Sequence, residues 1–386
     1  MAKLPASFPS LWWSFVLACH VLGSSCSTLE STVGRWHPVL RDRQKLARNG
    51  GGETRFSATD RFNSILQRNK KQTATTTSLL PDERNLQSTT TSTNNSSTPT
   101  PTSPIPCNEI LFEWTVQETV TAIAAFLTEF LPPSDAILAP LVLADVTFGI
   151  RAQKICAACT DFPELIANGD NTSFCQTDVY GATVAHSGVV YLPLKPSQSD
   201  ASQWVIAPGT RIPAIYCHGT RANGEMAMET LQTTPDPELF THLIIAATSG
   251  TLSILPDYMG YGASLGVVDK AYIVRQAYAT ASVPLVWRTR QLVEQETGCT
   301  TLMANAVGVS GYSEGGYASV AVAEALHGLG FDIIKLLSGG GPYALSSTQI
   351  SVSIQRLDDN TFPLDDEYYV ALLGSAYSST YRDLPK

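Results

Sequence analysis

Charged residues are scarce in this chain of 386 residues. Asp, Glu, Lys and Arg together make up 15% of it, whereas soluble domains usually carry about a quarter. The charge is also unevenly placed. Residues 1–106 hold 12 Lys and Arg against 6 Asp and Glu, and residues 107–386 hold 13 against 28. Because nucleic-acid binding needs clustered basic side chains, the acidic balance of the larger part excludes nucleic acid as a partner.

Long hydrophobic runs are missing except near the N-terminus. Residues 11–23 form an apolar run that follows Lys3 and precedes the small residues Ser24 and Ser25, which is the pattern of a secretory signal peptide. The run is short for a bilayer span, and no later segment reaches 18 uninterrupted apolar residues. We predict a signal peptide over residues 1–25 and a secreted or cell-surface protein, with an uncleaved anchor as the alternative.

Complete cofactor and metal motifs are missing as well. Cys156 and Cys159 form a Cys-x-x-Cys pair, a redox or zinc half-site, but no second pair of cysteines or histidines completes a zinc set. We therefore expect no cofactor and no metal. Structural disulfides are the preferred role of the cysteines in the folded part. Six cysteines allow three bridges whose pairing stays open: Cys107, Cys156, Cys159, Cys175, Cys217 and Cys299.

Residues 26–106 have the composition of a disordered segment. Their first part is polar and basic, and residues 72–106 are dominated by Ser, Thr, Pro and Asn, which cannot bury enough apolar surface to offset the entropy of ordering. We predict a stalk that carries O-linked sugars. Asn94, Asn95 and Asn171 lie in N-glycosylation sequons. The basic part could be a pro-segment cut at Lys70–Lys71, or a plain solvated tail.

The folded domain is expected over residues 107–386, with an α/β fold. Helical spacing predicts a helix within 110–130, and residues 179–192 predict a pair of strands. Apolar strands then alternate with helices, which implies a mostly parallel sheet covered by helices on both faces. The expected strands are 212–217, 252–256, 302–310 and 333–337, and the expected helices are 237–247, 269–297 and the stretch from residue 317.

One motif outweighs the others. Gly311-Tyr-Ser313-Glu314-Gly315 lies between an apolar strand and an Ala-rich helix, and Gly-x-Ser-x-Gly in that context is a nucleophile elbow. The glycines permit a sharp turn that exposes the serine. Ser313 is therefore the predicted nucleophile, and the dipole of the following helix adds positive partial charge beside it.

Two loops precede this motif at the same edge of the sheet. His218-Gly219-Thr220 follows a strand, and a turn here supplies one backbone N–H of an oxyanion hole while the residue after the nucleophile supplies the other. The predicted donors are therefore around Thr220 and on Glu314, with Gly219 in the turn. Asp257, in Pro-Asp-Tyr-Met-Gly-Tyr-Gly, is expected to hold its loop by hydrogen bonds, because the acid of a triad in this fold follows the serine.

Together these motifs resemble secreted α/β-hydrolases of the lipase and esterase type, including fungal secretory lipases. The resemblance covers roughly residues 180–345 and includes Ser338-Gly-Gly-Gly-Pro-Tyr343, which is similar to a loop of that family. It implies hydrolysis of carboxylic esters, of small molecules or lipids, through an acyl-enzyme. It also implies that residues 344–386 begin a helical cap, which could touch a lipid interface. Oligomeric state is not predicted.

The acid and the histidine of a triad are not found. His327 follows Ser313 by 14 residues on one helix, about 21 Å along its axis, so it cannot be the base. His218 lies in the oxyanion turn, and His186 and His242 lack a motif. The carboxylates that follow Ser313 are expected to form a solvated face. They are Asp358, Asp359, Asp365 and Asp366.

We therefore expect a serine esterase or lipase whose sequence ends early, so that the 386-residue form has little turnover of its own. A catalytically inactive hydrolase fold used for binding is the alternative, motivated by the stalk and the missing base. An acyltransferase or a peptidase on the same elbow is a further alternative, which the sequence does not separate from an esterase.

Overall fold

A computed structural model describes the chain in segments: 107–130, 139–167, 175, 180–200, 202–207, 212–221, 236–298, 303, 305–359 and 364–381. The predicted signal peptide, stalk and sequons, together with Cys299, lie outside these residues. Two compact units divide the chain. The larger one holds described residues 107–343 and 375–381. The smaller one holds 344–374, which contain a π-helical turn η8 (Leu345–Gln349), α11 (Ile350–Asp358) and the first part of α12 (Leu364–Thr380).

A mixed sheet forms the centre of the larger unit. Its strands lie in the order β1-β2-β3-β6-β5-β7-β8, and β4 pairs with β3. The parallel part consists of β6 (Ser253–Pro256), β5 (Ala214–Cys217), β7 (Ala306–Tyr312) and β8 (Asp332–Gly339). The predicted α/β fold is therefore confirmed, and its predicted strands lie at or close to the positions expected.

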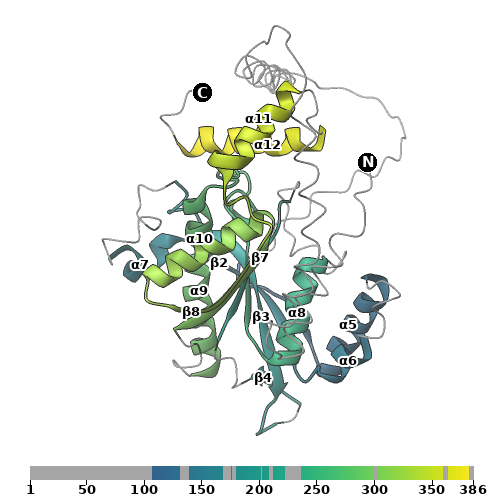
Figure 1. Ribbon diagram of the computed structural model, residues 1–386. Coiled ribbons are helices and arrows are strands. Elements are labelled where there is room, and N and C mark those ends of the chain that lie inside the picture. The colour runs from purple at the N-terminus through teal and green to yellow at the C-terminus, as the bar shows by residue number, and fades with distance from the viewer. Residues whose placement is uncertain are drawn as a thin grey trace, which may run out of the picture. The chain divides into compact units, whose positions relative to one another are not determined.

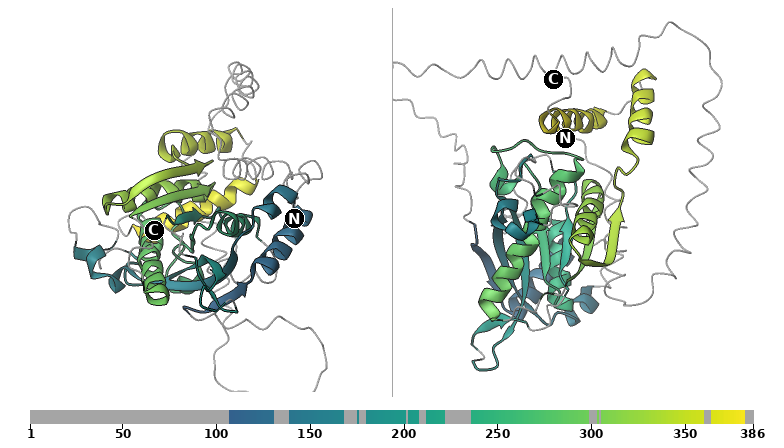
Figure 2. Two further views of the ribbon diagram at one scale, coloured as in Figure 1. Left: turned by 90° about the horizontal axis from the view of Figure 1, so that it is seen from below. Right: turned by 90° about the vertical axis from the view of Figure 1, so that its left-hand side faces the viewer.

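Helices cover both faces of this sheet (Figures 1 and 2). One face carries α9 (Arg275–Thr297) and α10 (Glu314–Gly328), and the other carries α5 (Val116–Phe130), α6 (Ala139–Ala144) and α8 (Pro237–Ser249). A helix between two parallel strands lets the chain return to the same end of the sheet. As a result, the loops after β5, β6, β7 and β8 meet at one edge.

Strong local signals delimit α8. The Asp236 carboxylate accepts hydrogen bonds from the N–H groups of Glu238 (2.9 Å) and Leu239 (3.3 Å), and proline occupies the first helical position. These features satisfy N–H groups that the helix itself leaves unpaired. Gly250 ends the helix in the left-handed conformation, with φ of 67°, which glycine adopts without steric cost. The helix that follows the His218-Gly219-Thr220 turn therefore has a well-defined start and end.

The sequence prediction was wrong in the N-terminal half of the sheet. The helix expected within residues 110–130 is present as α5, but the strand β1 (Ile110–Trp114) that precedes it was not expected. The paired strands expected over 179–192 are a single strand, β3 (His186–Pro196), whose antiparallel partner is β2 (Gly149–Ala157). The remaining elements of this part are β4 (Trp204–Ile206), η4 (Cys159–Asp161) and α7 (Pro163–Ala167). In β2 the polar residues Gln153 and Lys154 are buried with the apolar ones, so no alternation reveals the strand.

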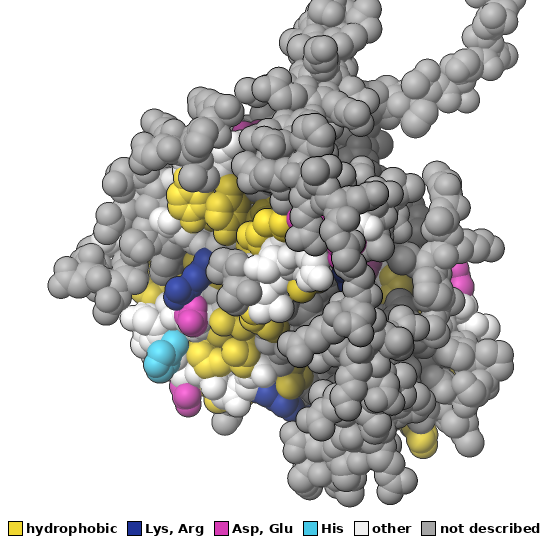
Figure 3. Space-filling view, turned by 45° about the horizontal axis from the view of Figure 1, so that its top comes forward, with side chains coloured by type: hydrophobic (Ala, Val, Ile, Leu, Met, Phe, Trp, Pro, Cys, Tyr) yellow, Lys and Arg dark blue, Asp and Glu magenta, His cyan; other side chains and the backbone are white. Residues whose placement is uncertain are grey.

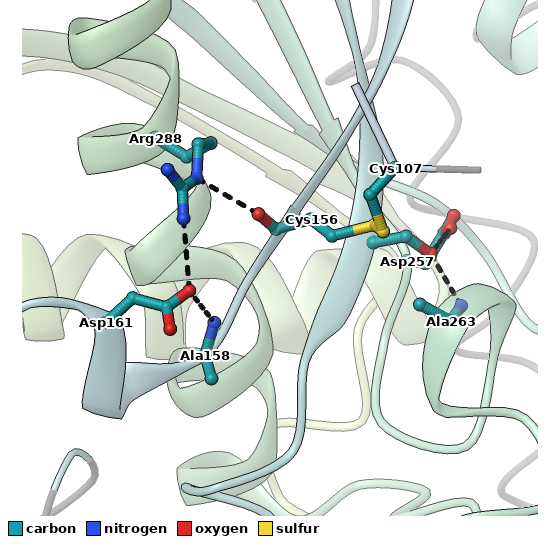
Figure 4. Close-up of a disulfide and its surroundings, with 8 residues drawn as sticks. Cys107, Cys156, Ala158, Asp161, Asp257, Ala263 and Arg288 are labelled. Atoms are coloured by element: carbon teal, nitrogen blue, oxygen red, sulfur yellow. Dashed lines mark hydrogen bonds and ion pairs between the residues drawn. A yellow bond between two sulfur atoms is a disulfide. The ribbon is translucent and has the colours of Figure 1, made fainter. Parts of the chain in front are cut away.

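Two disulfides join the segments around β2. Cys107 pairs with Cys156 and Cys159 pairs with Cys175, so the Cys-x-x-Cys pair is neither a redox disulfide nor a zinc half-site. Figure 4 shows Arg288 of α9 beside the first bridge, where it donates to the Cys156 carbonyl (3.1 Å) and to Asp161. Of the three bridges that six cysteines allow, two are present among the described residues, where Cys217 is a free, buried thiol.

The core lies between the sheet and its helices. Its largest fully buried side chains include Tyr191, Tyr216, Tyr258 and Tyr278. In the described part of the chain, no helix is both long and apolar enough to cross a membrane. Nor do His, Cys, Asp and Glu side chains gather there in a group that could hold a metal ion.

Apolar side chains are also exposed. On β8, the last strand of the sheet among the described residues, Ile334 is 52% and Leu336 41% exposed. The pairing of β7 with β8 shifts register at Ile334, and α10 packs on β8. Figure 3 shows hydrophobic side chains at the surface among charged ones on the face that it presents.

Candidate active site

Ser313 lies at the turn between β7 and α10. Its φ of 58° and ψ of −122° place a residue with a side chain in a region that such residues rarely occupy. Its N–H donates to the Gly339 carbonyl (2.9 Å), and its side chain is half-buried. The turn is therefore held by the neighbouring strand end, and backbone strain of this kind is concentrated at functional sites.

The glycines on either side of Ser313 are needed for close packing. A Cβ on Gly311 would collide with the backbone of Gly315, and a Cβ on Gly315 would collide with the carbonyl groups of Cys217 and His218. The elbow therefore presses directly against the end of β5. This close approach brings the His218-Gly219-Thr220 turn beside the predicted nucleophile.

Half-buried carboxylates and a half-buried arginine anchor this turn. The Gly219 N–H donates to Glu238 Oε2 (3.0 Å), so it is engaged by a side chain. Arg221 pairs with Asp236 (2.5 Å) and lies 3.7 Å from Glu238. Burial raises the pKa of Glu238, and the positive charge of Arg221 opposes that rise. Gly219 thus shapes the turn, while the predicted backbone donor stays with its neighbour Thr220.

Tyrosines of the Pro-Asp-Tyr loop hold the same turn from the other side. Tyr258 donates its hydroxyl to the His218 carbonyl (2.8 Å), and Tyr261 donates to the Arg221 carbonyl (3.1 Å). The His218 ring stacks on Tyr258 at 4.0 Å, and its Nδ1 lies 2.7 Å from the Gly219 carbonyl. Burial, helped by the charge of Arg221, lowers the pKa of His218 to about 3. His218 is therefore a neutral part of the turn, as its position in the sequence suggested.

The sequence motif predicted a role only for the backbone of Glu314, and not for its side chain. Its carboxyl group is buried and accepts a hydrogen bond from the Tyr278 hydroxyl of α9 at 2.7 Å. Burial raises the pKa of Glu314 to about 7, and Tyr278, Thr220, Lys270 and Arg221 oppose the rise. The sequence signal was a carboxylate directly after the nucleophile, at the start of an apolar helix.

Asp257 holds its loop by hydrogen bonds. Its Oδ2 accepts from the Ser187 hydroxyl of β3 at 2.6 Å, and the Ser187 oxygen in turn accepts from the Ala263 N–H at 2.8 Å, the link drawn at the right of Figure 4. A Cβ on Gly262 would collide with both Ser187 and Asp257. This contact set agrees with the role expected for Asp257 from the sequence.

A third loop supports the elbow from beyond β8. Ser338 donates its hydroxyl to the Gly316 carbonyl (2.6 Å) and lies 2.5 Å from the Tyr343 hydroxyl. A Cβ on Gly316 would collide with the Gly339 carbonyl. The Ser-Gly-Gly-Gly-Pro-Tyr segment is thus part of the elbow's packing.

The other histidines of the described residues have environments of their own. Burial lowers the pKa of His186 to about 4, and its Nε2 lies 3.0 Å from the Gly181 carbonyl. His242 stacks on Tyr216 at 4.2 Å, and His327 lies in the last turn of α10. Asp358 and Asp359 lie at the end of α11, and Asp365 and Asp366 lie in α12. None of the hydrogen bonds described for His186, and none of the ring contacts of His242, involves Ser313.

A mixed sheet with a strand–serine–helix elbow at the carboxyl end of its parallel strands, and a supporting turn after the next strand, defines the α/β-hydrolase fold. No protein-family model matches the chain, and no curated protein matches it either.

Solved structures are similar to it at low identity. A Legionella pneumophila protein assigned as a hydrolase has 17% identity and a TM-score of 0.48, over 72% of this chain and 61% of that one. The cell wall degrading esterase LipA from Xanthomonas oryzae has 17% identity and a TM-score of 0.43, over 68% and 61%. Candida antarctica lipase A has 13% and 0.29, over 52% and 40%. The chain thus spans about three fifths of each of the first two structures and about two fifths of the third.

Proposed function

We propose that this chain carries the nucleophile and the oxyanion hole of a serine hydrolase that cleaves carboxylic esters. The conformation of Ser313 supports this most directly, since a strained non-glycine residue at a strand–helix turn needs a reason to persist. The two disulfides are compatible with the secreted protein that the N-terminal sequence predicts.

In the proposed reaction, the Ser313 oxygen attacks the ester carbonyl carbon. The resulting oxyanion accepts hydrogen bonds from the N–H groups of Glu314 and Thr220, an arrangement that often supplies the largest single part of the rate enhancement. Collapse of the intermediate releases the alcohol and leaves an acyl group on Ser313, which water then removes. A general base has to take the serine proton, and none of the described histidines is assigned to that role.

Two variants test the proposal on the full-length protein with p-nitrophenyl butyrate and a fluorophosphonate probe. Ser313→Ala should abolish both ester turnover and labelling. Ser310→Ala, a change of the same type three residues earlier on β7, should retain them. Turnover that survives Ser313→Ala would reject Ser313 as the nucleophile, and a wild type that neither turns over nor labels would favour the alternative of a hydrolase fold used for binding.

The proposed substrate class follows from the resemblance of the sequence motifs to those of lipases and esterases. Small-molecule esters and lipid esters both fit it, and the segment over residues 344–386 is the candidate for contact with a lipid interface. Turnover of p-nitrophenyl butyrate compared with p-nitrophenyl palmitate separates the two substrate classes.

A further inference from the structure

Two buried oxygen atoms beside the elbow lack a hydrogen bond within the described structure. They are Oε2 of Glu314 and Oγ1 of Thr220. Buried polar groups are nearly always paired, because a buried group without a partner costs about 1–3 kcal/mol. The two side chains are close enough for the Thr220 hydroxyl to act on the protonation of the Glu314 carboxyl.

The other oxygen of Glu314 is firmly held. Its Oε1 accepts from the Tyr278 hydroxyl (2.7 Å), and that hydroxyl accepts from the Ile273 N–H (2.8 Å). Tyr278 is itself fully buried and packs edge-on against Tyr258 at 4.7 Å between ring centres. The carboxyl group of Glu314 is therefore fixed to α9 and can serve as a rigid support for a neighbouring group.

We propose that Glu314 is a positioning residue, whose carboxyl group pairs with the Thr220 hydroxyl and ties Thr220 to Tyr278 so that the Thr220 backbone faces Ser313. This inference rests on the proposed function, because it concerns the geometry of the oxyanion hole. The same residue then contributes twice, once by its backbone N–H and once by holding the second donor in place.

Ionisation of the Glu314 carboxyl affects the charge beside the oxyanion hole but not the pairing with Thr220. The groups that face the Glu314 carboxyl are Tyr278 of α9, Thr220 and Arg221 after β5, Lys270 before α9 and Tyr258 after β6. The threonine hydroxyl can donate to an ionised carboxylate or accept from a neutral carboxyl, so the pairing survives ionisation. Ionisation does place a negative charge next to a forming oxyanion, which disfavours the transition state.

Two substitutions separate the pairing from the charge. Glu314→Leu removes both, and Glu314→Gln keeps a hydrogen-bonding group without the charge. Glu324→Leu and Glu324→Gln are the matched controls, since Glu324 lies on the same helix but is half exposed and pairs with Arg275. Hydrogen exchange of the backbone over residues 218–221 measures the support directly and does not depend on turnover.

We expect exchange over 218–221 to be about tenfold faster in Glu314→Leu and near the wild-type rate in Glu314→Gln. Turnover of p-nitrophenyl butyrate should fall about tenfold or more in kcat for the Leu variant, with KM little changed, because misplaced donors weaken transition-state stabilisation. Above pH 7 the Gln variant should be faster than the wild type. Equal exchange in Glu314→Leu and Glu324→Leu would overturn the proposal.

A second pair of variants decides the case if Glu314→Leu does not fold. Thr220→Val removes the hydroxyl at nearly the same shape, and Thr220→Ser keeps it. Faster exchange and lower kcat in the Val variant with rescue by Ser supports the pairing, and equal behaviour of the two rejects it. Turnover that survives Ser313→Ala would reject the proposed function, whereas the exchange measurement would still decide whether Glu314 holds Thr220.

Discussion

Ser313 has a backbone conformation that favours glycine, with φ of 58° and ψ of −122°. A strained residue of this kind costs about 1–3 kcal/mol, which the surrounding contacts must offset. We predict that Ser313→Gly raises the free energy of unfolding by about 1 kcal/mol, because the strain is relieved. Ser313→Ala should not, because alanine keeps its Cβ. Chemical denaturation of both variants measures the difference, and equal stability would show that the turn is not strained.

Gly315 is required by the contact between the elbow and β5. A Cβ there would collide with the carbonyl groups of Cys217 and His218, which are backbone atoms and cannot move aside cheaply. Gly315→Ala should lower the free energy of unfolding by about 2 kcal/mol or more. Gly328, at the end of the same helix, has no atom within 4 Å of such a Cβ. Gly328→Ala should be neutral or stabilise by up to about 1 kcal/mol, which thermal unfolding of the pair can show.

Glu314 makes stability depend on pH. Its pKa is about 7 in the folded protein and 4.5 as the model value for an unfolded chain, so the folded state binds the extra proton between these values. Stability from this group is present below pH 4.5 and is lost as pH rises through 7. Glu314→Gln should therefore gain stability over the wild type by about 3 kcal/mol at most at pH 8 and little at pH 4. Denaturation at the two pH values, with Glu324→Gln as the control, checks the sign.

At the scale of elements, the disulfide between Cys107 and Cys156 ties the start of the folded segment to β2. The bridge closes a loop of 49 residues, which corresponds to about 4 kcal/mol in the chain-entropy estimate. We predict that Cys107→Ser lowers the free energy of unfolding by about 2–4 kcal/mol. Arg288 also bonds the Cys156 carbonyl, so β2 should stay in place. Equal stability with and without the bridge would mean that its loop is already ordered in the unfolded chain.

The sequence predicted those elements whose boundaries are local. Asp236 and Gly250 mark α8, and the glycines around Ser313 mark the turn into α10, so the crossovers and the elbow follow from short-range patterns. Strand β2 was not predicted, because its buried residues include the polar Gln153 and Lys154 and its sequence therefore shows no alternation of apolar and polar residues. Of the site, the turn and the serine could be predicted. The contact between Glu314 and Tyr278 could not, because it joins residues 36 positions apart.

At the scale of the whole molecule, β8 is the last strand of the sheet among the described residues, and it carries exposed apolar side chains. Ile334 and Leu336 are both exposed there, and Lys335 lies between them. An exposed strand at the end of a sheet can pair with other chains. We predict that Leu336→Lys lowers self-association in sedimentation velocity at micromolar concentration, with the melting temperature nearly unchanged. Unaltered association would show that this face is covered in solution.

The free thiol of Cys217 has a practical consequence. Its carbonyl lies against Gly315, and burial raises the pKa of its thiol to about 12, so alkylating reagents should react with it only when the elbow separates from β5. The rate of Cys217 modification, followed by peptide mass spectrometry, then reports how often the elbow separates from β5. A ligand that binds at Ser313 should lower this rate even before any product can be measured.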